Sequence, residues 1–269
     1  MDRTGGRGQA SDGCPELATR PNLARATNYL VGGGANFAPD RAAVNEMLAM
    51  DPGLGRRIQA GRAFVARAVR DALDGGCDQF LELGAGIPSP AGLHSLVGPD
   101  ARVVYVDVDP VAVAHTRDLL AAEEAGRVAV VEADLRDAAG VLTQLATGPL
   151  DLGRPVTLVC NSVLQWVADS DGTELARTFE AYRSALAPGS RLVISVAHPD
   201  ELAAEEAAEV RPIIEAAVAP LRLRGRAELD RILGAWEPLP PGIVDAVDWP
   251  VASGAETSGF YAVVCAARR

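Results

Sequence analysis

The segment QFLELGAGIPS, residues 79–89, contains the pattern that decides the fold. Its first five residues form a short, mostly apolar run, and a glycine-rich turn follows at Gly84 and Gly86. Glycine lets the backbone adopt left-handed conformations and approach a ligand closely. We therefore expect a buried strand that ends in a ligand-binding turn, with the next helix beginning at Ser89–Pro90 and pointing its amides toward the ligand.

Four further apolar runs follow this strand, and helical stretches separate them. The runs are RVVYV (102–106), RVAVV (127–131), VTLVC (156–160) and RLVIS (191–195), and the helical stretches lie near 89–97, 110–121, 137–146 and 172–186. Apolar strands that alternate with helices indicate a parallel sheet covered on both faces. Helices at 200–219 and 226–234 and two closing strands at 243–249 and 259–266 are expected to follow. The sequence thus predicts an α/β, doubly wound, mostly parallel seven-stranded sheet.

The first 76 residues differ from the remainder of the chain. Residues 1–20 are rich in Gly, Ser, Asp and Arg without periodicity, so we expect a disordered leader. Residues 24–48 indicate a glycine-rich loop and then a short helix, and residues 57–73 have the spacing of an amphipathic helix. We divide the chain into a leader (1–20), an N-terminal lid with helices (21–76) and a sheet domain (77–269).

Composition limits the chemistry and the partners. The chain has 25 basic and 36 acidic residues and a net charge of −11, which disfavours binding to nucleic acid or anionic membranes. It contains no lysine, which excludes a P-loop and a pyridoxal phosphate Schiff base. Three histidines without an HExxH motif give little support for a metal site. There is no apolar run of membrane-spanning length and no signal peptide pattern, so we expect a cytoplasmic protein.

Acidic residues stand at the ends of three successive predicted strands. Glu82 ends the first, and Asp107 ends the second, where doubly wound nucleotide folds place the carboxylate that binds ribose hydroxyls. Asp134 and Leu135 follow the third and can bracket an adenine ring. Asp109 is better explained as the N-cap of the next helix, and capping is also the alternative role for each of the other aspartates. The turn lacks the third glycine of GxGxxG, which disfavours a dinucleotide.

Taken together, these segments resemble a known family. The segments are YLVGGGANFAPDR (29–41), GRAFVARAVR (61–70), QFLELGAGIPS (79–89), ARVVYVDVDP (101–110), ADLRD (133–137) and LAPGSRLVIS (186–195). They are similar to the actinobacterial S-adenosylmethionine-dependent methyltransferase family, long described as a domain of unknown function. The resemblance covers about residues 23–200. It implies a class I methyltransferase fold with a Rossmann-like S-adenosylmethionine-binding domain and an N-terminal helical lid.

The resemblance also implies a set of cofactor contacts. A lid folded over the cofactor would bring Tyr29, Asn36, Arg41 and Arg62 toward the pocket. An arginine such as Arg62 can pair with the methionine carboxylate, although a solvated helix face is the alternative. The expected cofactor-binding residues are Tyr29, Arg62, Glu82, Gly84, Gly86, Asp107, Asp134, Leu135 and Asn161.

The acceptor is expected near the segment that follows the fourth strand. Gln165 and Trp166 lie there, with Trp166 as a wall of the acceptor pocket or, alternatively, as a core residue. His198, just past the fifth strand, is the best-placed general base if the acceptor needs deprotonation, and a helix cap is its alternative role. These three residues are the catalytic candidates.

Two positions depart from the family's usual pattern. Gly34-Ala35 stands where Lys-Asp is common, and VLQWV (163–167) stands where a His-aromatic pair is common; Gln165 cannot take a proton at physiological pH. The sequence predicts methyl transfer to a small-molecule acceptor and leaves a homodimer open. Two alternatives remain: an enzyme that uses the sulfonium for an elimination or cyclisation, and a regulatory protein that binds the cofactor without turnover.

Overall fold

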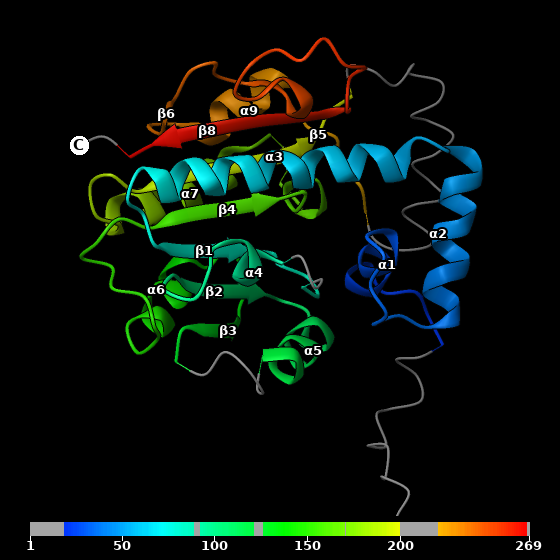
Figure 1. Cartoon of the computed structure of the whole chain (residues 1–269), viewed down its shortest axis with the longest axis horizontal. Coiled ribbons are helices and arrows are strands. Elements are labelled where there is room, and N and C mark those ends of the chain that lie inside the picture. The colour runs from blue at the N-terminus through cyan, green and yellow to red at the C-terminus, as the bar shows by residue number, and fades with distance from the viewer. Residues whose placement is uncertain (1–18, 89–91, 121–125, 170, 200–219, 268–269) are drawn as a thin grey trace, which may run out of the picture.

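The computed structural model describes residues 19–88, 92–120, 126–169, 171–199 and 220–267 (Figure 1). Its strands are β1 Gln79–Leu83, β2 Arg102–Asp107, β3 Val128–Glu132, β4 Thr157–Asn161, β5 Arg191–Ala197, β6 Glu237–Pro238, β7 Val244–Asp245 and β8 Phe260–Ala266. They form one sheet in the order β3-β2-β1-β4-β5-β8-β6, with β7 paired to β8 outside this path. Strands β1 to β5 are parallel, and β8 runs antiparallel to its neighbours. The predicted doubly wound, mostly parallel sheet is confirmed, with one short strand more than expected.

The helices are α1 Leu23–Leu30, α2 Ala38–Met50, α3 Leu54–Asp74, α4 Leu93–Leu96, α5 Pro110–Leu120, α6 Ala138–Leu145, α7 Thr173–Ala185 and α9 Arg226–Leu233, with 3-10 turns η2 Leu164–Trp166 and η3 Ala246–Asp248. Residues of α3, α4 and α5 enter the apolar core on one face of the sheet. Residues of α6, α7 and α9 enter the core on the other face. Figure 1 shows α1 and α2 beside the end of the sheet toward which the parallel strands point.

The strand order predicts a crevice at the carboxyl ends of the central strands β1 and β4. Strands β1, β2 and β3 follow one another outward in one direction, whereas β4 and β5 lie on the other side of β1. In doubly wound sheets ligands bind beyond the carboxyl ends of the strands at such a reversal. The turn after β1 and the segment after β4 therefore flank the expected site.

Two predicted elements differ in extent from the structure. The helix expected near 89–97 is limited to α4, and residues 89–91, including the expected helix start at Ser89–Pro90, lie outside the described residues. The strand expected at 243–249 is wrong beyond Asp245, because the Asp245 carboxylate accepts the Val247 amide hydrogen and begins η3. The leader and the helix expected at 200–219 also lie outside the described residues, apart from 19–20.

Helix α1 was not expected, because residues 24–48 indicated a loop before a single helix. Its N-cap is Asn22, whose side chain accepts the Arg25 amide hydrogen. Its buried face contains Arg25 and Asn28 as well as two alanines, so the sequence shows no apolar spacing there. A helix buried through polar residues needs partners that only the folded structure reveals.

The partner of Arg25 is Asp40 of α2, and both side chains are almost completely buried. The Asp40 carboxylate accepts from Arg25 Nε at 2.7 Å, from the Asn22 amide at 2.8 Å and from the Phe37 amide at 2.7 Å. A buried ion pair whose oxygens also accept other hydrogen bonds is expensive to disrupt. It joins α1 to α2, which together form the α1–α2 segment (residues 23–50).

Within the described part of the chain, no helix is both long enough and apolar enough to span a membrane.

Candidate active site

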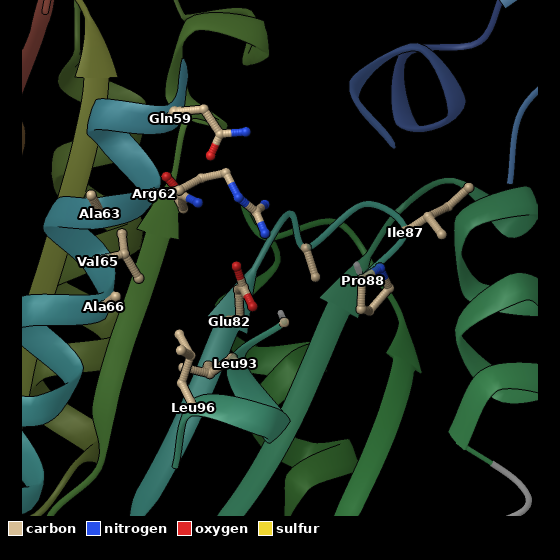
Figure 2. Close-up of a pocket in the computed structure, with 13 residues that line it drawn as sticks. Gln59, Arg62, Ala63, Val65, Ala66, Glu82, Ile87, Pro88, Leu93 and Leu96 are labelled. Carbon is tan, nitrogen blue, oxygen red and sulfur yellow. The ribbon is translucent and has the colours of Figure 1, made fainter. Parts of the chain in front are cut away.

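A cavity of about 550 Å³ lies at the carboxyl ends of the parallel strands. Its walls come from α1, α3, the segments that follow β1, β2, β3 and β4, and residues 220–222. A smaller pocket of about 230 Å³ shares Arg62, Glu82 and Asn161 with it and extends between α3 and α4 (Figure 2). We call these the main cavity and the side pocket.

The two glycines of the turn after β1 have different surroundings. Gly84 has φ +67° and Gly86 has φ +61°, both in the left-handed region. A Cβ on Gly84 would lie 2.1 Å from Cγ2 of Val163, whereas the nearest atom to a Cβ on Gly86 is Cβ of Ala24, 4.0 Å away. Gly84 is therefore required by close packing, and Gly86 leaves open space in the main cavity.

Asp107, at the end of β2, holds this turn in place. Its carboxylate accepts the Gly86 amide hydrogen at 2.7 Å and the Asp109 amide hydrogen at 2.9 Å. Burial raises the pKa of Asp107, and the amide donors partly oppose that rise. Asp109 accepts the Val111 amide hydrogen, the N-cap contact expected at α5, and also a 2.6 Å hydrogen bond from Asn22. The strand end thus contacts both the glycine turn and the start of α1.

Glu82 and Arg62 lie where the main cavity meets the side pocket. Figure 2 shows the Arg62 side chain extending from α3 toward the Glu82 carboxylate. Burial raises the pKa of Glu82 to about 7; Arg62 lowers this pKa and Asp107 raises it further. A carboxyl with this pKa can change its charge state near neutral pH.

Asp134 and Leu135 follow β3 and form another part of the main cavity wall. Arg136 donates to both carboxylate oxygens of Asp134 at 2.6–3.1 Å, and these hydrogen bonds lower the pKa of Asp134. The Leu135 carbonyl accepts a 3.0 Å hydrogen bond from the Tyr182 hydroxyl of α7. The loop is thus held to the helix beneath it.

Another part of the cavity wall comes from the segment after β4, which packs against the glycine turn through Val163. Asn161 and Trp166 both line the main cavity. A fully buried arginine, Arg224, donates to the Leu164 carbonyl at 2.9 Å and the Val167 carbonyl at 2.7 Å. It also pairs with Glu228. Arg224 therefore fixes the η2 turn that contains Trp166.

The comparisons with known proteins agree with this geometry. The model of a family described as S-adenosyl methyltransferase matches residues 15–267. The chain belongs to the S-adenosyl methyltransferase family. It is an S-adenosylmethionine-dependent methyltransferase, as the sequence predicted, and S-adenosylmethionine is its cofactor.

Solved structures are also similar to this chain. A proposed methyltransferase from Thermobifida fusca YX is 31% identical, with 96% of this chain and 99% of that chain covered and a TM-score of 0.81. A DUF574 family protein from Streptomyces avermitilis MA-4680 is 33% identical, with 93% and 98% covered and a TM-score of 0.80. A geranyl diphosphate C-methyltransferase from Streptomyces coelicolor A3(2) is only 15% identical, with 77% and 81% covered and a TM-score of 0.50, and shares the fold. A comparison with curated proteins gives no match.

The methyltransferase brings most of its sequence-predicted site residues to one cavity. Those that line the main cavity are Arg62, Glu82, Gly84, Gly86, Asp107, Asp134, Leu135, Asn161 and Trp166. They come from four strand ends and from α3, and they combine open space at Gly86 with carboxylates at three positions. This donor and acceptor set fits a ligand with an amino group, ribose hydroxyls and an adenine ring.

Five predicted residues do not line the cavity. The Tyr29 hydroxyl lies 3.4 Å from Oδ1 of Asn45, between α1 and α2. The Gln165 side chain is buried, and its Oε1 has no hydrogen-bond partner among the described residues. Asn36 and Arg41, which the resemblance also placed near the pocket, hydrogen-bond to each other at the surface instead.

His198 is the last of these residues. Its ring is buried and stacks on Tyr261, with the ring centroids 4.1 Å apart and an interplanar angle of 23°. Its Nε2 lies 4.0 Å from the Asp245 carboxylate. The structure therefore places this histidine against β8 and outside the cavity walls.

Sequence reasoning missed several residues that shape the site. Asn28 lines the main cavity, and its Oδ1 accepts the Ala35 amide hydrogen at 2.9 Å. Arg222 lines it too; it lies within residues 200–234, which were expected only as helices that close the far side of the acceptor entrance. An Asn just before a glycine-rich turn is a weak sequence pattern that could have pointed to Asn28. No nearby sequence pattern predicts that Arg25 pairs with Asp40.

Proposed function

We propose that the enzyme transfers the methyl group of S-adenosylmethionine to a small-molecule acceptor. The observation that carries this proposal is the extent of the main cavity. It continues from the carboxylates after β1, β2 and β3 to Trp166 and α1, with a volume of about 550 Å³. Cavities of this size are typical for ligands of small-molecule dimensions.

In this proposal the strand ends hold the cofactor. Asp107 would accept from the ribose hydroxyls, Glu82 would face the amino group, and Gly86 would give the backbone room to approach. Asp134 already binds Arg136 through both oxygens, so an adenine amino group would share this carboxylate with Arg136. Leu135 would pack against the ring.

The acceptor would lie between α1 and the segment 161–168. That part of the cavity is lined by Thr27 of α1, by Val31 directly after it, and by Val163, Trp166 and Val167, so the wall is largely apolar. When bound, the cofactor supplies an electrophilic methyl group on a sulfonium. The protein's own contribution is to align the acceptor and exclude water, and alignment alone can account for much of the rate. We propose that the α1–α2 segment acts as the lid.

The overall charge favours a small acceptor over a nucleic acid. The net charge is −11, and nucleic-acid enzymes normally present a basic surface along which phosphates bind. The carboxylates that line the cavity would also repel a polyanion, whereas they suit the amino group and ribose hydroxyls of the cofactor.

The test is incubation with S-adenosylmethionine that carries an isotopic label on its methyl group, together with a small-metabolite fraction, a protein fraction or RNA. We expect label in a product of the metabolite fraction. Consumption of the cofactor with an unlabelled product would instead support elimination or cyclisation. Binding without any product would support the regulatory alternative.

Asp107→Ala should reduce the labelled product, because it should weaken cofactor binding by about 1–3 kcal/mol, the scale of a lost hydrogen bond to a charged group. Asp78→Ala is the matched control. Asp78 precedes β1 at the opposite end of the sheet and pairs with exposed Arg154. Label in protein or RNA alone would contradict a small-molecule acceptor.

A further inference from the structure

The ends of β4 and β5 carry a polar cluster that includes Ser195, a residue to which the proposed function gives no role. Asn161 and Ser195 are neighbours in the parallel register of these strands. The Ser195 hydroxyl donates to Oδ1 of Asn161 at 2.8 Å. Ser195 is completely buried and does not line either cavity, whereas Asn161 lines both. A buried hydroxyl therefore holds a side chain that faces the ligand.

The hydrogen bonds around Ser195 fix which way the Asn161 amide faces. The Ser162 amide donates to Oγ of Ser195 at 3.2 Å, so this oxygen acts as an acceptor and its own proton remains for Asn161. With Oδ1 of Asn161 bound in this way, the Nδ2 group is directed away from Ser195. Nδ2 has no acceptor in the described ranges of the chain, and it is left to donate to a ligand.

The backbone at Ser162 supports a functional purpose for this arrangement. Ser162 has φ +54°, and no other non-glycine residue in the described ranges has a positive φ. A left-handed conformation costs a residue with a Cβ about 1–2 kcal/mol. Here it accompanies the donation of the Ser162 amide to both the carbonyl and the hydroxyl of Ser195. Strain of this kind is concentrated at ligand sites in proteins.

Helix α3 adds a cation beside the cluster. A Cβ on Gly61 would lie 3.6 Å from Oγ of Ser195 and 3.7 Å from Oγ of Ser162, so the helix packs directly on both serines. The next residue, Arg62, lines the same two cavities as Asn161, and Figure 2 shows it extending toward Glu82. Where the main cavity meets the side pocket, the wall therefore contains the guanidinium of Arg62, the primary amide of Asn161 and the carboxylate of Glu82.

We propose that Ser195 is a positioning residue that orients the Asn161 amide so that Nδ2, together with Arg62, binds the carboxylate at the methionine end of the cofactor. Two donor groups suit a carboxylate, and Glu82 suits the ammonium of the same amino acid. This proposal rests on the proposed function for its ligand. It adds Ser195, which has no contact with the cofactor, as a determinant of affinity for the amino-acid end.

The test compares two ligands by calorimetry at pH 8. S-adenosylhomocysteine contains the amino-acid end, and 5′-methylthioadenosine keeps the adenosine and sulfur but lacks it. Ser195→Ala should weaken binding of S-adenosylhomocysteine about tenfold, which equals about 1.4 kcal/mol, and leave 5′-methylthioadenosine within about twofold. Ser195→Thr, which keeps the hydroxyl, should keep the wild-type preference for S-adenosylhomocysteine over 5′-methylthioadenosine. Asn161→Ala should show the same selective loss as Ser195→Ala.

Ser190→Ala is the matched control. Ser190 is also completely buried, directly before β5, and its hydroxyl accepts the Val156 amide hydrogen and donates to the Ala187 carbonyl. Its loss should change neither affinity. Equal weakening of both ligands by Ser195→Ala would show a purely structural role and overturn the proposal, as would an unchanged preference in Asn161→Ala. A wild-type protein that binds neither ligand would instead contradict the cofactor assignment itself.

Discussion

At the scale of single residues, Glu82 links the charge of the site to pH. Burial raises the pKa of its carboxyl from the ordinary value of 4.5 to about 7, while the charge of Arg62 lowers this pKa and that of Asp107 raises it. Below pH 7 the neutral form therefore predominates, and above pH 7 the carboxylate does. A cofactor ammonium beside it would interact favourably only with the carboxylate form.

We therefore expect S-adenosylhomocysteine to bind more tightly as the pH rises through 7. With a pKa of about 7, the ionised fraction of Glu82 rises about tenfold between pH 6 and pH 8, and the association constant should rise by about the same factor. Calorimetry at several pH values measures this slope. Glu82→Gln should remove it, and 5′-methylthioadenosine, which has no ammonium, should not show it. The same slope in the Gln variant would contradict this role for Glu82.

The strand-end residues could be predicted from the sequence because parallel strands bring their carboxyl ends to one edge. Asp107, Asp134 and Asn161 each follow an apolar run, and all three line the main cavity. His198 also follows an apolar strand, but its ring turns toward Tyr261 and Asp245. The pairing of β5 with the antiparallel strand β8 decides this, and no local pattern near His198 specifies which strand lies beside it.

At the scale of elements, the turn after β1 shows why glycine is needed at two positions for two reasons. Both Gly84 and Gly86 have a positive φ, so alanine at either position costs about 1–2 kcal/mol of backbone strain. Only at Gly84 would the new Cβ also overlap Val163. The first glycine therefore joins the turn to the segment after β4, and the second leaves space for a ligand.

Gly84→Ala should accordingly lower the free energy of unfolding by about 3 kcal/mol or more, because overpacking adds to backbone strain. Gly86→Ala should lower it by about 1–2 kcal/mol in the absence of ligand. Denaturant titration without cofactor measures both. Equal losses would show that the contact between Gly84 and Val163 does not control this turn. Once ligand is added, Gly86→Ala should bind it more weakly, because its methyl group occupies the cavity.

Long apolar elements were predictable, and short or polar ones were not. Helix α3 was predicted at 57–73 because the residues of its buried face recur at regular helical spacing, and in the structure it extends only a few residues further. Helix α1 was missed, because Arg25 and Asn28 occupy its buried face. Strand β6 was not expected, and β7 covers only the start of the strand expected at 243–249. Each contains two residues that pair with the backbone of β8. Pairing of this kind depends on tertiary structure.

At the scale of the whole molecule, the main cavity is built from parts that are far apart in sequence. The sheet supplies the strand ends, and α1 closes the same space from the other side. Two contacts connect these parts at one place. Asn22 donates to Asp109 at the end of β2 through its side chain and to Asp40 of α2 through its amide. Disturbance of the α1–α2 segment should therefore reach the cofactor site.

Asp40→Asn tests this coupling without touching the cavity, because Asp40 is completely buried and does not line it. The amide has one acceptor oxygen in place of two, and it leaves the buried Arg25 without a counter-charge. Breaking a buried ion pair in this way costs about 3–5 kcal/mol. We expect faster hydrogen exchange across residues 22–50. We also expect weaker binding of S-adenosylhomocysteine, because apparent affinity falls with the fraction of molecules in the binding-competent state.

Asp78→Asn is the control for this prediction, because it weakens an exposed ion pair with Arg154 at the opposite end of the sheet. Exposed pairs contribute little to stability, so neither exchange in 22–50 nor ligand affinity should change. Saturating ligand should restore part of the protection in Asp40→Asn, since binding favours the closed arrangement. If exchange accelerates in 22–50 while affinity stays at the wild-type value, the α1–α2 segment does not act as a lid, and the sheet alone binds the cofactor.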